Sequence, residues 1–183
     1  AKAQAAFADY GQYLDSLEMT ATIKGFEPLY IQRIAQLTNK SNQFNLTTLR
    51  CSEDDIRAMA GDKNDLCLCG KLVDKFGDNG IVTVVAGRQQ GDVLDLTLWL
   101  MSCRVLKRGM EDAMMDTVVA EAAARGVKTI VGHYYPTAKN AMVREFYAQY
   151  DFTKTAEDAD GNTEWTLDVA AYTPKHPHMK IER

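Results

Sequence analysis

The sequence contains no apolar run that approaches the roughly 20 residues of a membrane-spanning helix, so we expect no membrane partner. It lacks the apolar core of a secretory signal peptide near its start. Its net charge of −4 gives no reason to expect nucleic-acid binding. No internal repeat and no linker divides the 183 residues. These absences predict one globular, cytoplasmic domain, and a chain of this length can bury a core of ordinary size.

Cysteine is scarce, and its spacing argues against a common class of metal site. The four cysteines are Cys51, Cys67, Cys69 and Cys103. They form no Cys-x-x-Cys pair and have no His nearby, as a zinc site of that class would require. Cys67 and Cys69 lie two apart in a predicted strand, so they share a face and cannot easily pair. We predict reduced thiols and no metal site.

The most regular part of the sequence, residues 93–152, predicts a strand, a basic turn, a helix, a strand and a second helix. Residues 93–101 alternate Leu94, Leu96, Leu98 and Leu100 with other residues, the pattern of a strand with one uniformly apolar face. The turn is residues 102–109. A turn of free backbone amides that opens a helix is a binding site for an anion.

Helical spacing continues on both sides of the next short strand, residues 129–135. The first helix, residues 110–125, places an apolar residue at every fourth position: Met110, Met114, Val118 and Ala122. The second, residues 140–150, has Asn140 as its expected N-cap. Its apolar stripe is Val143, Phe146, Tyr147 and Tyr150.

The remaining elements are predicted from their ends. Pro28 starts a helix, and Ser52 with Asp55 forms a capping box that opens a shorter one. Asn79-Gly80 is a turn signal between two strands. Residues 172–183 show no pattern, so we expect a loosely held tail. The other expected elements are a helix at 3–17, strands at 17–23, 66–73 and 80–86, and a hairpin that turns at 159–162 into a strand at 164–169.

Several motifs resemble a known acyltransferase family. Arg104-x-x-Lys-x-Gly109 is similar to the acetyl-CoA-binding turn of the GNAT fold, and Asn140, Phe146, Tyr147 and Phe152 have the spacing of that fold's next motif. Three longer strings resemble the C-terminal domain of FkbH-like proteins: Trp99-Leu-Met-Ser-Cys-Arg-Val-Leu, Thr38-Asn-Lys-Ser-Asn-Gln-Phe-Asn-Leu-Thr-Thr48 and Pro136-Thr-Ala-Lys-Asn-Ala141.

This resemblance implies an α/β fold of the GNAT class, a mixed and mostly antiparallel sheet flanked by helices. The helix at 110–125 would connect the two strands of one parallel pair. Ligands would then enter between those two strands at their carboxyl ends. The expected organisation is a linker helix at residues 1–16, a GNAT-like domain at 17–170 and a C-terminal tail at 171–183.

The resemblance also implies a function. The domain would handle an acyl thioester, of the glyceryl type, on a phosphopantetheine thiol of an acyl carrier protein or of coenzyme A. Its partners would be the carrier protein and an upstream HAD-like domain in a longer parent chain. Two alternatives stay open: an acetyl-CoA-dependent N-acetyltransferase, and a non-catalytic module that docks the carrier protein.

The candidate cofactor site centres on the basic turn. Its amides would hold a diphosphate, and its cations would add charge. Lys107 stands where the resembled motif has Gly, and Glu111 and Asp112 would repel phosphate, so a solvated basic turn is the alternative interpretation. The candidate cofactor-binding residues are Met101, Ser102, Cys103, Arg104, Lys107, Arg108, Gly109, Met110 and Asn140.

The catalytic candidates each have a structural alternative. The resemblance makes Tyr147 an acid for the leaving thiolate, although its spacing also fits a core aromatic. His133 is a candidate base or a structural histidine. Cys103 would tether an acyl group or only pack. The candidate substrate-binding residues, whose polar members equally suit a loop that satisfies its own backbone, are Asn42, Gln43, Asn45, Thr47, Asp78, Asn79 and Trp99.

Overall fold

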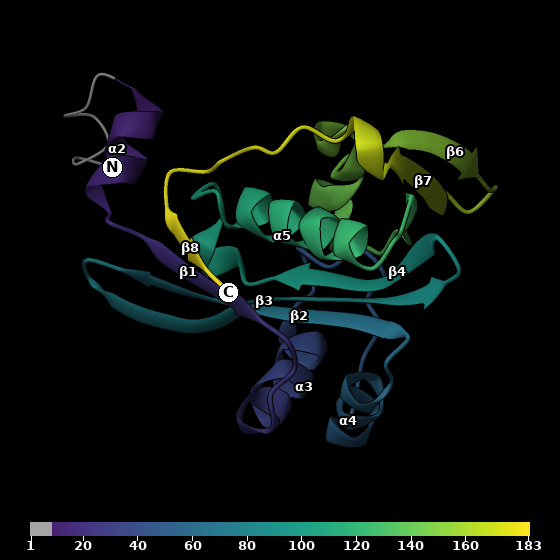
Figure 1. Cartoon of the computed structure of the whole chain (residues 1–183), viewed down its shortest axis with the longest axis horizontal. Coiled ribbons are helices and arrows are strands. Elements are labelled where there is room, and N and C mark those ends of the chain that lie inside the picture. Colours follow the sequence, from purple (N-terminus) through teal and green to yellow (C-terminus); the bar gives the residue numbers. More distant parts are fainter. Residues whose placement is uncertain (1–8) are drawn as a thin grey trace.

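The computed structural model describes residues 9–183, which form an eight-stranded sheet in the order β6-β7-β5-β4-β3-β2-β1-β8 (Figure 1). The strands are β1 Thr20–Lys24, β2 Asp65–Asp74, β3 Gly77–Gln90, β4 Val93–Met101, β5 Thr129–Tyr134, β6 Thr153–Glu157, β7 Thr163–Asp168 and β8 Lys180–Glu182. The α-helices are α2 Tyr10–Ser16, α3 Ile31–Lys40, α4 Glu53–Gly61 and α5 Met110–Ala124. Short 3-10 helices cover Pro28–Tyr30, Cys103–Val105, Ala141–Val143, Tyr147–Tyr150 and Val169–Ala171.

The sheet is mixed and mostly antiparallel, which confirms the predicted fold class. Strands β4 and β5 are parallel, as are β1 and β8, and the other neighbours are antiparallel. Helices α3 and α4 cover one face, and α5 lies on the other (Figure 1). Each layer has its own apolar core, one centred on Ile34 and Ile56 and the other on Met114 and Trp99. No helix of the described residues is long and apolar enough to cross a membrane.

Local sequence signals account for the helix ends. The Ser52 hydroxyl accepts a hydrogen bond from the Asp55 amide, and the Asp55 carboxylate accepts one from the Ser52 amide, so the predicted capping box is confirmed. Pro28 opens the 3-10 turn that leads into α3. The apolar stripe of α5 is fully buried. Of the helix expected at residues 3–17, Tyr10–Ser16 is observed, and residues 1–8 lie outside the described part.

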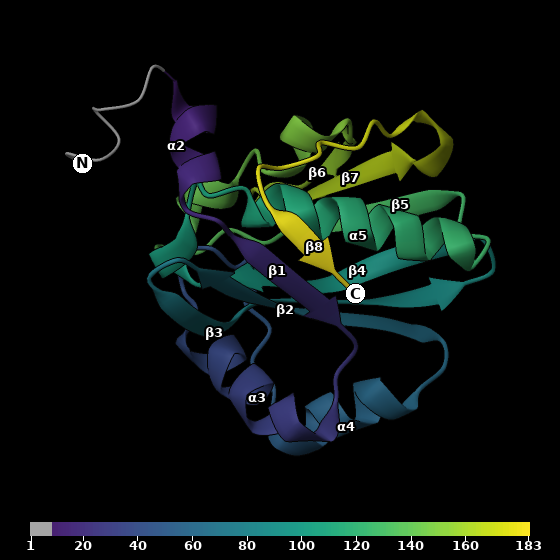
Figure 2. The same ribbon diagram turned by 60° about the vertical axis from the view of Figure 1, so that its left-hand side comes forward.

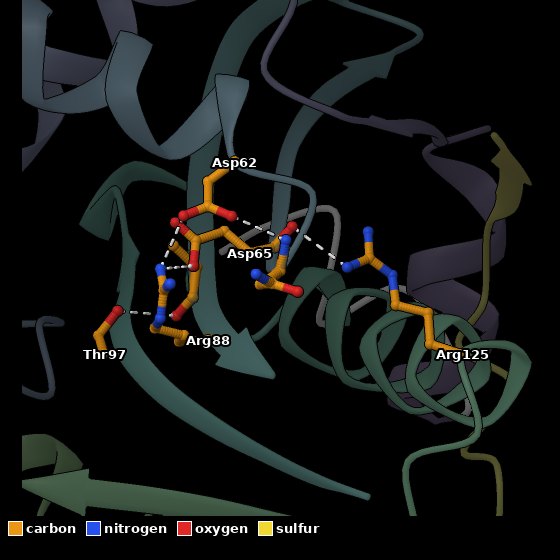
Figure 3. Close-up of polar contacts among 7 residues, drawn as sticks. Asp62, Asp65, Arg88, Thr97 and Arg125 are labelled. Atoms are coloured by element: carbon orange, nitrogen blue, oxygen red, sulfur yellow. Dashed lines mark hydrogen bonds and ion pairs between the residues drawn. The ribbon is translucent and has the colours of Figure 1, made fainter. Parts of the chain in front are cut away.

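An ion-pair network ties α4 to the sheet. Arg88 on β3 contacts Asp62 at the end of α4 at 2.9 Å and Asp65 on β2 at 3.2 Å, as Figure 3 shows. Arg125, at the end of α5, donates to the carbonyl of Asp65 at 3.2 Å. Helices on opposite faces of the sheet therefore meet the same corner of β2.

The prediction of one apolar face along β4 is wrong. The pairing with β3 shifts between Ala86 and Gly87, which leaves Thr97 as an extra residue on β4. Such a bulge reverses the side-chain alternation beyond it. Leu94 and Leu96 consequently pack on the α5 side, whereas Leu98 and Leu100 pack against α3 and α4. The bulge turns Trp99 into the α5-side core.

One predicted turn and one predicted helix differ from the structure. The hairpin between β2 and β3 turns at Lys75 and Phe76, while Asn79-Gly80 lies inside β3 at an irregular part of the pairing. The predicted helix at 140–150 is two short 3-10 helices instead. Its predicted apolar residues are nevertheless buried, so the pattern located the buried face but not the type of helix.

The C-terminal tail is not loosely held, contrary to prediction. Its last residues form β8, which extends the sheet beside β1 (Figure 2). Asp116 of α5 fixes the segment that leads there, because its carboxylate accepts hydrogen bonds from the Tyr172 hydroxyl and from the amides of Lys175 and His176. The tail is therefore fixed to the middle of α5.

Candidate functional site

A cavity of about 630 Å³ lies where β4 ends, between the C-terminal part of α3 and the loop that follows it. Its lining combines apolar, polar and cationic side chains. The lining residues are Arg33, Leu37, Lys40, Ser41, Asn42, Gln43, Phe44, Met101, Ser102, Cys103, Arg104 and Lys139. Six candidates from the sequence meet here: Asn42, Gln43, Met101, Ser102, Cys103 and Arg104.

The thiol of Cys103 is exposed at this cavity because β4 stops two residues earlier. The Ser102 amide donates to the carbonyl of Val82 at 2.7 Å, and its hydroxyl accepts from the Arg104 amide, which starts a single 3-10 turn. In that turn Cys103 Sγ lies 3.3 Å from Gln43 Oε1. Two residues predicted for different roles are thus hydrogen-bonded to each other.

Sequence reasoning missed three of the four cations at the cavity. Arg33 and Lys40 come from α3 and its end, Lys139 follows β5, and only Arg104 was predicted. Arg33 donates to the side-chain carbonyl of Gln36 at 2.8 Å, and Arg104 donates to the Asn79 carbonyl at 3.3 Å. Both acceptors are neutral. These residues lie up to about a hundred positions apart, so no local signal groups them.

The turn predicted to bind a diphosphate is already occupied by the chain itself. The carboxylate of Glu111 accepts a hydrogen bond from the Lys107 amide at 3.3 Å. Burial raises the pKa of Glu111, and hydrogen bonds from the amides of Glu111, Lys107 and Gly109 act in the opposite direction. The amides that would face an anion at the start of α5 therefore face an internal carboxyl group.

Other segments cover the same turn. The Tyr10 hydroxyl of α2 donates to the Lys107 carbonyl, and Pro177 of the tail lies against Gly109. Arg108 forms an ion pair with the buried Asp74 at 2.8 Å. Met110 is fully buried. The predicted cofactor residues Lys107, Arg108, Gly109 and Met110 are thus absent from the lining of the cavity at the end of β4.

The expected ligand entrance between β4 and β5 is also closed. The two strands pair only as far as Asp95 and Val131. Beyond that point the chain segment 44–46 lies between them: the Leu46 amide donates to the Trp99 carbonyl at 3.0 Å, and the Leu46 carbonyl accepts from the Tyr135 amide at 2.9 Å. On the β4 side the Met101 amide donates to the Phe44 carbonyl at 3.0 Å. The segment 44–46 therefore fills the gap between β4 and β5.

Asn140 holds this inserted segment. It stands at the N-cap position, as predicted, but its side chain makes no capping hydrogen bond to the 3-10 helix that follows. Asn140 Nδ2 donates to the carbonyls of Asn45 at 2.9 Å and Tyr135 at 3.0 Å, while Oδ1 accepts from the Thr137 amide at 2.8 Å. Asn45 and Asn140 are both 0 % exposed, so neither can contact a bound ligand in this conformation.

Tyr147 lies in the core rather than at the cavity. It is 1 % exposed, its ring packs on Gly132 of β5, and it contacts the rings of Trp99 and Phe146. Burial raises the pKa of its hydroxyl, which keeps the group protonated. The interpretation of Tyr147 as a core aromatic fits this placement, and Trp99, predicted to bind substrate, is likewise buried in the core.

The other candidates lie apart from the cavity lining. His133 Nε2 is 2.6 Å from Asp95 Oδ1, which orients the imidazole on β5. Thr47 donates to the Thr97 carbonyl at 2.8 Å. Asp78 pairs with Lys71 at 2.8 Å, and Asn79 Nδ2 donates to the Leu72 carbonyl. The site thus offers one exposed thiol beside uncompensated positive charge, a combination suited to holding an anionic ligand near a nucleophile.

Comparisons with known proteins identify the fold. No protein-family model and no curated protein sequence matches the chain. The ribosomal-protein-S18-alanine N-acetyltransferase of Escherichia coli is 15 % identical and has a TM-score of 0.61, with 81 % of this chain and 94 % of that one covered. The GNAT domain of S. lividans PAT is 16 % identical, covers 80 % and 89 %, and has a TM-score of 0.61.

A third structure is the spermidine N-acetyltransferase of Vibrio cholerae in complex with CoA and spermine. It is 9 % identical, and the match covers 82 % of this chain and 96 % of that one with a TM-score of 0.61. At these identities the likeness concerns the course of the backbone alone. The chain has the GNAT acetyltransferase fold, as the sequence predicted.

Proposed function

We propose that the chain transfers an acyl group to or from a phosphopantetheine thiol, and that it does so at the cavity beside Cys103. The observation that carries this proposal is the exposed Cys103 thiol at the edge of a cationic cavity of about 630 Å³. Cavities of that size hold small organic ligands. The acyl group of the glyceryl type and the upstream HAD-like domain follow from the family resemblance, and the cytoplasmic location follows from the composition of the sequence.

An acyl carrier protein suits this chain better than coenzyme A as the carrier of that thiol. Coenzyme A brings a diphosphate, and the turn that would bind it presents its amides to Glu111. Carrier-bound phosphopantetheine brings a single phosphodiester and needs no such turn. The ~630 Å³ cavity offers that phosphodiester cations that are not paired with carboxylates.

The proposed reaction is a thiol–thioester exchange. The Cys103 sulfur attacks the acyl carbonyl, its proton passes to the departing phosphopantetheine sulfur, and the acyl group stays on Cys103 until a second thiol removes it. Gln43 Oε1, 3.3 Å from the sulfur, orients the thiol. Neither Tyr147, the candidate proton donor, nor His133, the candidate base, lines the cavity. Either residue would need a change in conformation to reach the Cys103 thiol.

The test is acylation of the intact protein. We would incubate it with an acyl-carrier protein and, separately, with acyl-CoA, and measure mass gain at Cys103 and release of the free thiol. We expect acylation from the carrier protein that Cys103→Ser abolishes, with Cys51→Ser as the matched control. If the wild type and both variants bind the carrier protein tightly but none of them transfers an acyl group, the result would instead support a docking module.

A second candidate is an acetyl-CoA-dependent N-acetyltransferase. The names of the structurally similar proteins, which include a spermidine and a ribosomal-protein N-acetyltransferase, favour it. Thiol release from acetyl-CoA over a panel of amines and peptide N-termini separates the two. Release that depends on an amine and is unaffected by Cys103→Ser would replace our proposal with this one.

A further inference from the structure

Among the residues that the structure describes, no carboxylate forms an ion pair with the cations at the cavity, which are Arg33, Lys40, Arg104 and Lys139. By contrast Arg88 is held by two aspartates, as Figure 3 shows. The chain as a whole carries a net charge of −4. Positive charge is therefore gathered at one cavity against the overall balance of the protein.

Such a cavity attracts anions. A hollow lined by charge of one sign concentrates ligands of the opposite sign, and its lining contains no Asp or Glu to compete. Arg33 and Arg104 offer planar groups that match phosphate oxygens, and the two lysines offer point charges. Ser41, Asn42 and Ser102 add neutral hydrogen-bonding groups at the same lining.

The remaining wall of the cavity indicates what accompanies the anion. Leu37, Phe44 and Met101 form an apolar side, and the Cys103 thiol lies on the same lining. Free phosphate would leave both features unused. A ligand with a phosphate at one end and an uncharged chain that carries sulfur or an acyl group at the other would contact them all.

We propose that this cavity is a binding site for a phosphate ester with an uncharged chain, of the phosphopantetheine class, and that Arg33, Lys40, Arg104 and Lys139 are its phosphate-binding residues. The choice of phosphopantetheine as the ligand rests on the proposed function. The phosphate would lie among the cations, and the chain would run along the apolar wall toward Cys103.

The first experiment compares ligands that differ in one group. The whole protein is titrated by calorimetry with 4′-phosphopantetheine, with pantetheine and with inorganic phosphate, at low and at high salt. We expect phosphopantetheine to bind at least roughly tenfold more tightly than either other probe, a difference of about 1.4 kcal/mol, because its phosphate adds charge-assisted hydrogen bonds to the cations. Its advantage over pantetheine should shrink with salt. Equal affinities for phosphopantetheine and pantetheine, or for phosphopantetheine and phosphate, would overturn the proposal.

The second experiment uses matched lysine variants. Lys40 and Lys139 are exposed at the cavity, and Lys63 is exposed elsewhere. We expect Lys40→Gln and Lys139→Gln each to weaken phosphopantetheine binding several-fold, up to about tenfold, without changing pantetheine binding, whereas Lys63→Gln changes neither. If all three variants bind phosphopantetheine like the wild type, these residues do not bind its phosphate.

These measurements also separate the site from the proposed function. Phosphopantetheine binding that depends on Lys40 and Lys139, in a protein that transfers no acyl group, would leave the site standing and remove the function. Acyl transfer that continues with unchanged affinity in both variants would remove the site and leave the function.

Discussion

Asn140→Ala should destabilise the protein far more than the loss of a helix cap. The buried carbonyl of Asn45 loses its 2.9 Å hydrogen bond, and the Tyr135 carbonyl and the Thr137 amide lose theirs. A buried group left without a partner costs about 1–3 kcal/mol. Water can reach the last two groups in part, so we expect a loss of about 3 kcal/mol, against about 1 for a cap.

The assay is urea denaturation at equilibrium. A loss of about 3 kcal/mol would lower the midpoint by about 1.5 M if the slope is about 2 kcal/mol/M. Asn64→Ala is the matched control, because its side chain is exposed. A loss of 1 kcal/mol or less for Asn140→Ala, with the slope unchanged, would refute the bridging role that the structure gives this residue.

A second variant tests the same reasoning through pH. Asn140→Asp keeps the acceptor for the Thr137 amide but turns a carboxylate oxygen toward the carbonyls of Asn45 and Tyr135. The pKa of the new carboxyl group should be raised, because the protonated form can donate a hydrogen bond to one of these carbonyls. Its deficit in stability should therefore shrink as the pH falls through that raised pKa. A deficit that does not vary with pH would contradict this.

Three further outcomes are expected. Gly132→Ala should cost about 3 kcal/mol in urea denaturation, since a Cβ there would lie 2.5 Å from the buried Tyr147 ring; a loss below 1 would mean the ring moves freely. Burial raises the pKa of Glu111, so the stability that this group contributes falls as the pH rises above the ordinary pKa of Glu. The free energy of unfolding of Glu111→Gln should therefore increase relative to that of the wild type from about pH 4 upward, and a difference that does not vary with pH would count against this. Asp116→Ala should release the hydroxyl of Tyr172 and speed proteolysis within residues 172–183, and unchanged cleavage would show that β8 alone holds the tail.

The elements that the sequence predicted are those whose pattern is local. The α5 stripe and the Ser52 capping box are each set by residues within a few positions of one another. The β4 bulge depends instead on its partner strand. At Gly87 of β3 an added Cβ would lie 3.0 Å from the Asp95 carbonyl, so a side chain there would disturb the close approach of the strands at the bulge. Alternation along β4 alone cannot report that contact.

The same distinction holds for the site. Residues 101–104 were predicted because they lie at the end of one strand, and Asn42 and Gln43 because they belong to one polar loop. The occupation of the turn by Glu111 was foreseen only as repulsion of phosphate. The carboxyl group of Glu111 faces these amides because α2 and the tail bury the turn. Sequence spacing does not specify that covering.

The inserted segment 44–46 makes the cavity depend on the sheet. It continues directly from Ser41, Asn42 and Gln43 at the cavity, and its backbone is bonded to β4 on one side and to the residue after β5 on the other. Asn140, fully buried, bonds to the middle of that segment. A change at Asn140 should therefore loosen the loop that presents Gln43 to Cys103 without touching a cavity residue. Weaker phosphopantetheine binding in Asn140→Ala, measured where the variant is still folded, would show that the closed gap between β4 and β5 positions the site; unchanged binding would show that the cavity loop keeps its shape by its own contacts.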